Sequence, residues 1–221
     1  AETFDRDLAD HFETQARVSR AIVTSLSPQI DRAEAARIRV LAPEDLTAHG
    51  LAQRAWAVVS SGEMAYDRGP RDRAEALALE ALARDAASAL AWRVLAWVAW
   101  WHVYHGTTDS VLDTLAAGIE AATRAIAIDR TDHQARRLRA QLHFMNQDVA
   151  AGLPELRRAH EMNPNCAVTL CWLGFYEAIN GQAEIGVPLA EAGLRRSPLD
   201  PARGSMLCAL GFAQFAARDY A

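Results

Sequence analysis

The chain has 221 residues, 51% of them apolar, so it can bury the core of one large domain or two small ones. Its formal net charge of -5 excludes the strongly basic surface of a typical nucleic-acid-binding protein. The stretch "AETFDRDLAD" has no basic segment followed by an apolar core, so it is not a signal peptide.

The first 42 residues are expected to form a helical segment that joins an upstream domain. An amphipathic helix is indicated by apolar residues at Leu8, Phe12, Ile22, Val23 and Leu26. Ser27 followed by Pro28 resembles a helix N-cap with proline at the first helical position, which predicts a second helix to about Val40. Pro43 then marks a break.

Beyond this break, three sets of positions recur every 34 residues. They are Gly118, Gly152 and Gly186; Ala125, Ala159 and Gly193; and Arg130, Pro164 and Pro198. Small residues let two helices approach closely, and a proline after the second helix ends it. This period is typical of helix–turn–helix repeats. We therefore predict an all-α fold, a right-handed α-α superhelix (solenoid) of stacked helix pairs.

The first helices of three units fit a W-x2-L-G frame. The frame is occupied by Trp92, Leu95 and Ala96, by Leu170, Leu173 and Gly174, and by Leu207, Leu210 and Gly211. These residues resemble the tetratricopeptide repeat (TPR) pattern from about Ala55 onward. The resemblance implies a TPR-like domain over residues 43–221, with units near 55–88, 89–132, 133–166 and 167–200 and a truncated unit over 204–221.

The unit over residues 89–132 is ten residues longer than the period. We expect both of its helices to be extended and to protrude, with Asp109 or Ser110 capping the second. Its first helix contains the tryptophan-rich stretch "AWRVLAWVAWWHVYHG". A membrane span over Ala86–Val103 is the alternative, but Arg93 near its middle opposes it.

The inner face of such a superhelix is the candidate binding groove. On the TPR frame, the inward positions are Arg93, Trp97, Trp100, Trp101, Arg137, Gln141, Met145 and Phe175. Aromatic, methionine and arginine side chains are enriched in binding hot spots. An extended peptide or an internal tail segment is the expected ligand. In the alternative interpretation, the three tryptophans only cover the extended helix pair.

Catalytic and cofactor motifs are sparse. His102, His105 and Asp109 could bind zinc, which makes a metal-dependent hydrolase an alternative function. No Ser/His/Asp order, Gly-rich phosphate loop or HExxH motif is present, so we predict neither an enzyme nor a cofactor. A third possibility is a structural spacer, in which Trp97→Ala and Arg137→Ala would alter no binding.

The three cysteines lack the spacing of a disulfide framework or a zinc site. Cys166, Cys171 and Cys208 are therefore expected to be reduced, buried thiols in a cytoplasmic protein.

The N-terminal stretch "FDRDLADHFETQARVSRAIV" and the following "SPQIDRAEAARIRVLAPEDLTAHGLAQRA" resemble the join between a TolB-like domain and TPR repeats. That join is found in bacterial class III adenylate or guanylate cyclases and in winged-helix regulators. The resemblance implies a non-catalytic interaction module of a signalling protein, which binds a protein or peptide segment or pairs with itself. It would regulate an upstream cyclase or DNA-binding domain, with neither nucleic acid nor membrane as a direct partner.

The sequence stops at "ARDYA", where the second helix of the last unit should begin. We therefore expect a fragment of a longer protein whose exposed C-terminal face is covered by another copy, giving a homo-oligomer.

Overall fold

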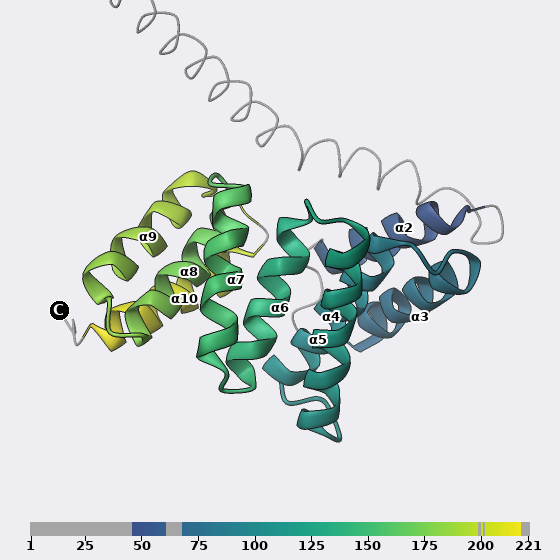
Figure 1. Cartoon of the computed structure of the whole chain (residues 1–221), viewed down its shortest axis with the longest axis horizontal. Helices are drawn as coiled ribbons and strands as arrows, with labels where there is room; N and C mark the ends of the chain where they lie inside the picture. The colour runs from purple at the N-terminus through teal and green to yellow at the C-terminus, as the bar shows by residue number, and fades with distance from the viewer. Residues whose placement is uncertain (1–45, 61–67, 199, 201, 218–221) are drawn as a thin grey trace, which may run out of the picture.

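The computed structural model describes residues 46–60, 68–198, 200 and 202–217, and all regular secondary structure within them is helical (Figure 1). The helices are α2 (Ala48–Ser60), α3 (Arg68–Arg84), α4 (Ala89–Tyr104), α5 (Val111–Ile128), α6 (His133–Met145), α7 (Val149–Met162), α8 (Ala167–Ile179), α9 (Ala183–Arg196) and α10 (Arg203–Ala216). The predicted all-α class is confirmed. The helical segment predicted over residues 1–42 lies outside the described residues.

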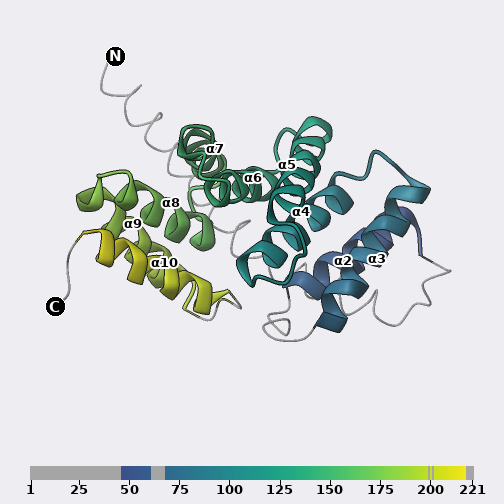
Figure 2. The same ribbon diagram turned by 90° about the horizontal axis from the view of Figure 1, so that it is seen from below.

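Consecutive helices pack as the pairs α2–α3, α4–α5, α6–α7 and α8–α9, and α10 packs on α8 and α9. The pairs follow one another along an arch, with α5 and α7 on its outer side (Figure 2). One cluster of buried residues runs from Ala96 in α4 to Ala209 in α10, and a second joins α2 and α3 to α4. In the part of the chain described, no helix is both long and apolar enough to span a bilayer.

The turns between one pair and the next share a hydrogen-bond pattern. Side-chain oxygens of Asp85, Asp129 and Asn163 each accept a bond from the backbone N–H two residues later, at 2.9 to 3.2 Å. The next first helix then begins at an N-cap: Ser88 caps α4 and Asp132 caps α6. Local side-chain bonds of this kind stop one helix and start the next, so the sequence itself sets the boundaries of the pairs.

The recurring small residues lie where neighbouring helices approach most closely. A Cβ atom added at Gly118 would lie 2.7 Å from Cβ of Ala99, and one added at Gly186 would lie 2.7 Å from the backbone N of Ala178. Gly152 is similarly enclosed. Small side chains at these positions therefore face neighbouring helices, as the period of 34 predicts.

The first unit and the long unit differ from a regular repeat. The first unit was predicted to begin near Ala55, but α2 begins at Ala48, because Thr47 Oγ1 accepts a bond from Gly50 N at 3.2 Å and starts the helix there. In the long unit, α4 has 16 residues and α5 has 18, against 13 and 14 in α6 and α7. Ser110 caps α5, and the pair reaches beyond its neighbours (Figure 1).

Candidate binding surfaces

The eight side chains predicted to line an inner groove lie in or against the packed interior. Trp100 and Trp101 are only 8% and 5% exposed, Arg137 is 9% exposed and Gln141 is fully buried. The other four, Arg93, Trp97, Met145 and Phe175, are half-buried. A groove role for these residues stays a prediction. Their burial favours the alternative, in which the tryptophans cover the extended helix pair.

Trp101 joins α4 to α3. The guanidinium carbon of Arg71 lies 3.7 Å from the centroid of the Trp101 ring, and His105 stacks on the same ring with centroids 3.6 Å apart. Burial, followed by the charge of Arg71, lowers the pKa of His105. A cation held over an indole in this way stabilises packing, so the Trp101 ring is already covered by Arg71 and His105 of the same chain.

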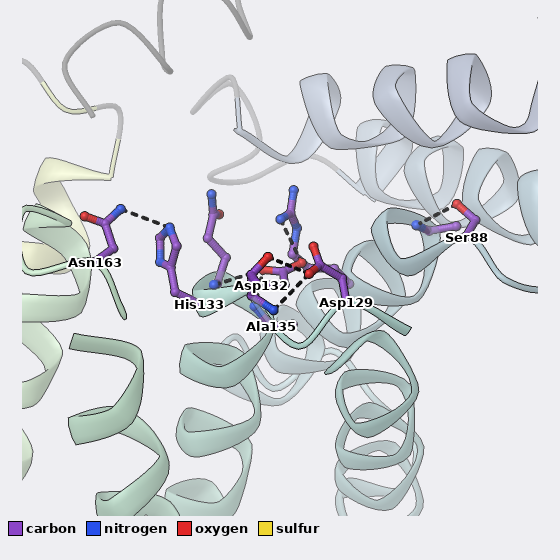
Figure 3. A network of polar contacts seen from close by, with 10 residues as sticks. Ser88, Asp129, Asp132, His133, Ala135 and Asn163 are labelled. Atoms are coloured by element: carbon purple, nitrogen blue, oxygen red, sulfur yellow. Dashed lines mark hydrogen bonds and ion pairs between the residues drawn. The ribbon is translucent and has the colours of Figure 1, made fainter. Parts of the chain in front are cut away.

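Arg93 joins three successive units. Its Nη1 donates to Asp132 Oδ2 at 2.9 Å, and its guanidinium carbon lies 4.2 Å from the centroid of the Trp56 ring in α2. The other oxygen of Asp132 accepts bonds from the backbone N–H groups of Gln134 and Ala135, the latter visible in Figure 3. Arg93 and Asp132 therefore hold the start of α6 against α4 and α2.

A cavity of about 350 Å³ opens beside this network. It is lined by His49, Asp85, Ala87, Ser88, Ala89, Leu90, Arg93, Asp129 and Asp132. Its acidic side chains already accept bonds from their own turns, since Asp85 binds Ala87 N and Asp129 binds Thr131 N. These carboxylates serve helix capping, and nothing in the cavity points to a particular ligand.

Aromatic side chains fill the inner side of the arch between units. Trp100 of α4 meets Trp172 of α8 edge to face at 6.2 Å between centroids, and Phe175 of α8 meets Phe212 of α10 at 5.3 Å. Burial, followed by the neighbouring Cys208 of α10, raises the pKa of Tyr104 at the end of α4. The extended α4 thus reaches α10, and aromatic rings of first helices from different units pack against one another.

The residues proposed for a metal site do not assemble into one. His102 Nδ1 lies 2.9 Å from Thr107 Oγ1, His105 stacks on Trp101, and Asp109 is exposed. Within the described ranges, no group of three or more His, Cys, Asp or Glu side chains could hold a metal ion. The metal-dependent hydrolase is therefore not supported.

α10 has an exposed face at the C-terminal end, where the sequence predicts a face covered by another copy, although none of the predicted groove residues lies on it. We call the surface of Gly204, Leu207, Gly211 and Phe215 the α10 face. Leu207 is 47% exposed and Phe215 is 67% exposed. A Cβ atom added at Gly204 or Gly211 would meet nothing within 4 Å. Large apolar side chains that lie beside glycines on one exposed helix face mark a candidate binding site.

The same face of α8 is packed. Gly174 holds the place in the W-x2-L-G frame that Gly211 holds in α10. A Cβ atom at Gly174 would meet the carbonyl of Gly186 and lie 2.6 Å from Ala190 N, both in α9. Leu170, the counterpart of Leu207, is 1% exposed. In α8 this face receives a helix, whereas in α10 no described helix covers it. The frame predicts this face from the sequence, but only the structure shows that no described helix covers it.

No family model and no curated protein matches this sequence. Solved structures with a similar arrangement include YrrB, described as a TPR protein with an unusual peptide-binding site: 18% identity, TM-score 0.49, covering 78% of this chain and 79% of that one. Another is the MamA protein, with 16% identity and a TM-score of 0.46, covering 77% of this chain and 88% of that one. The helix pairs themselves, and not these likenesses, establish the stacked all-α arrangement.

Proposed function

We propose that this chain is a non-catalytic protein-interaction module that receives a partner's helix on the α10 face. The observation that carries the proposal is the contrast between two equivalent glycines: a Cβ atom at Gly174 would meet the backbone of α9, whereas one at Gly211 would meet no described atom within 4 Å. A face with the residues for helix packing that no described helix covers is suited to binding one.

The α8–α9 contact indicates the chemistry of the partner. There α9 presents Gly186, Ala190 and Gly193, and Gly193 packs against Cys171 of α8. Spacings of four and three place these small residues on one helix face. The expected ligand is an amphipathic helix with a similar stripe of small residues, from another protein or from a second copy of this chain.

The experiment uses the α9 sequence as its probe. A labelled peptide of residues Ala183–Arg196, extended at both ends with helix-forming residues, is titrated with the protein and followed by fluorescence anisotropy. Gly211→Leu fills the contact and Phe215→Glu places a charge on it, so each should weaken binding at least tenfold, or about 1.4 kcal/mol. Sedimentation velocity over a range of concentrations tests the second-copy alternative.

A matched control is available on α5. Leu112 is 71% exposed and lies outside the α10 face, so Leu112→Glu should leave binding unchanged. Equal binding by Gly211→Leu, Phe215→Glu and the original chain would contradict the proposal, as would an equal loss in Leu112→Glu. Circular dichroism of each variant checks that its helix content is retained.

We further propose that the module works within a bacterial signalling protein in the cytoplasm. The resemblance of the first residues to the join between a TolB-like domain and TPR repeats supports an upstream cyclase or DNA-binding domain. Occupation of the α10 face would then change the activity of that domain. Sequencing the reading frame upstream of Ala1 tests this setting directly, and a frame that encodes neither domain would remove it.

A further inference from the structure

Cys166 occupies a position that oxygen side chains fill at the starts of α4 and α6. It is the N-cap of the 13-residue helix α8, where Ser88 and Asp132 cap α4 and α6. Unlike those two, Cys166 makes no side-chain hydrogen bond to its helix, and it is partly exposed. The positive end of the α8 dipole favours a negative charge at this sulfur.

His133, the first residue of α6, lies against the turn that leads into Cys166, where Asn163 O accepts a bond from Cys166 N at 3.2 Å. Its Nε2 is 3.0 Å from Asn163 Nδ2 (Figure 3). The amide orientation is fixed, because Asn163 Oδ1 accepts a bond from Asn165 N at 3.2 Å. Since an amide nitrogen only donates, Nε2 accepts and the imidazole proton lies on Nδ1. That nitrogen is buried and has no hydrogen-bond partner in the described structure, so its proton is available to a thiolate at Cys166.

Two further donors that act on Cys166 are buried. Thr169 is fully buried, and its hydroxyl has no hydrogen-bond partner in the described part of the chain. Arg137 is 9% exposed; its Nη1 binds Gln141 Oε1 at 2.6 Å, while its Nε is unpartnered. A buried donor without an acceptor is costly, so both side chains are suited to an anion at the sulfur.

The electrostatic balance at Cys166 favours the thiolate. Burial raises its pKa, but the donor groups of His133 and Thr169 and the charge of Arg137 outweigh burial and bring it to about 7. Burial lowers the pKa of Arg137, and the charges of Asp132 and Asp200 in the flanking turns oppose this shift.

We propose that Cys166 is a reactive thiol at which hydroperoxides oxidise this chain. The thiolate attacks the terminal oxygen of the hydroperoxide, the sulfur–oxygen bond forms and the oxygen–oxygen bond breaks. Sulfur loses two electrons and the peroxide gains them. The leaving alkoxide takes a proton from water at the partly exposed site, giving a sulfenic acid, an alcohol and hydroxide.

The other two cysteines serve as internal controls. Cys171 is fully buried, and burial raises its pKa to about 12, so it should be inert. Contrary to the expectation from the sequence, Cys208 is exposed, and it lies in α10 beside Tyr104 of α4. If solvent exposure alone decided reactivity, Cys208 would be oxidised first. If the donors around the sulfur decide it, Cys166 is oxidised first.

The test follows alkylation of the folded chain by iodoacetamide between pH 5.5 and 9, with each cysteine resolved by peptide mass spectrometry. The Cys166 rate should reach half its maximum near pH 7, and hydrogen peroxide should form sulfenic acid, trapped with dimedone, at Cys166 first. An ordinary thiol is only about 3% ionised at pH 7, so His133→Gln should lower the Cys166 rate there by up to about 15-fold.

Thr169→Val is the second variant, because it keeps the shape of the side chain and removes only the hydroxyl. It should raise the pH midpoint of Cys166 alkylation and leave that of Cys208 unchanged. The proposal is overturned if the Cys166 midpoint lies above pH 8 in the original chain, if Cys208 is oxidised first, or if neither variant moves the Cys166 midpoint.

Discussion

At the scale of single residues, Gly174 and Gly211 have equivalent places in their helices but different surroundings. An added methyl group at Gly174 would collide with backbone atoms of Gly186 and Ala190, which cannot move without separating α8 from α9. At Gly211 the same group would enter open space. Substitutions at the two positions therefore separate the cost of overpacking from the low helix propensity of glycine.

We predict opposite effects for the two alanine substitutions. Gly174→Ala should lower the free energy of unfolding by about 1–3 kcal/mol, because the overpacked helices must shift. Gly211→Ala should raise it by up to about 1 kcal/mol, since alanine favours the helix and meets nothing. Urea denaturation followed by circular dichroism measures both changes. A gain in stability at Gly174 would mean that α8 and α9 approach less closely than the structure indicates.

Sequence reasoning identified the packing residues better than the binding residues. The small residues recur at fixed offsets because every pair repeats the same contact, so Gly118 and Gly186 could be placed from the period alone. The exposure of Trp100 or Gln141 depends instead on how far the extended α4 reaches toward α10, and on which rings meet across the arch. Those contacts join distant parts of the chain and leave no period in the sequence.

At the scale of helices, Asp132 combines two roles at the start of α6. One oxygen caps the helix and the other pairs with Arg93, whose side chain is 15% exposed. Asp132→Ala removes both roles and leaves a largely buried cation without its counter-ion, so it should cost roughly 3 kcal/mol or more. Asp132→Asn keeps the capping oxygen and should cost less. Thermal and urea unfolding of both variants would measure the difference.

Ser110 supplies the comparison for a cap without an ion pair. It caps α5 through a 3.4 Å bond to Asp113 N, so Ser110→Ala should cost only about 1 kcal/mol. If Asp132→Ala cost no more than Ser110→Ala, the pair between Arg93 and Asp132 would contribute nothing to stability. The helix boundaries could be predicted from such caps, whereas the ion pair between residues 39 positions apart could not.

At the scale of the whole molecule, the contact between Trp100 and Trp172 changes how the chain should unfold. In a simple solenoid each unit touches only its neighbours, and units can unfold separately. Here rings of α4 and α8 meet across the intervening α6–α7 pair. This long-range contact couples the two halves of the arch, so the original chain should unfold in one transition.

We predict that Trp172→Ala will split this transition. The substitution leaves a cavity costing about 3–5 kcal/mol and removes the contact between the halves. The remaining five tryptophans all lie in α2 and α4, so their fluorescence reports the N-terminal half while circular dichroism reports every helix. In urea, the two signals should coincide for the original chain and separate for Trp172→Ala. Leu156→Ala, which empties a fully buried site in α7 without touching the ring contact, should lower the midpoint and keep the signals together. Coincident signals in Trp172→Ala would show that the halves are coupled through neighbouring units alone.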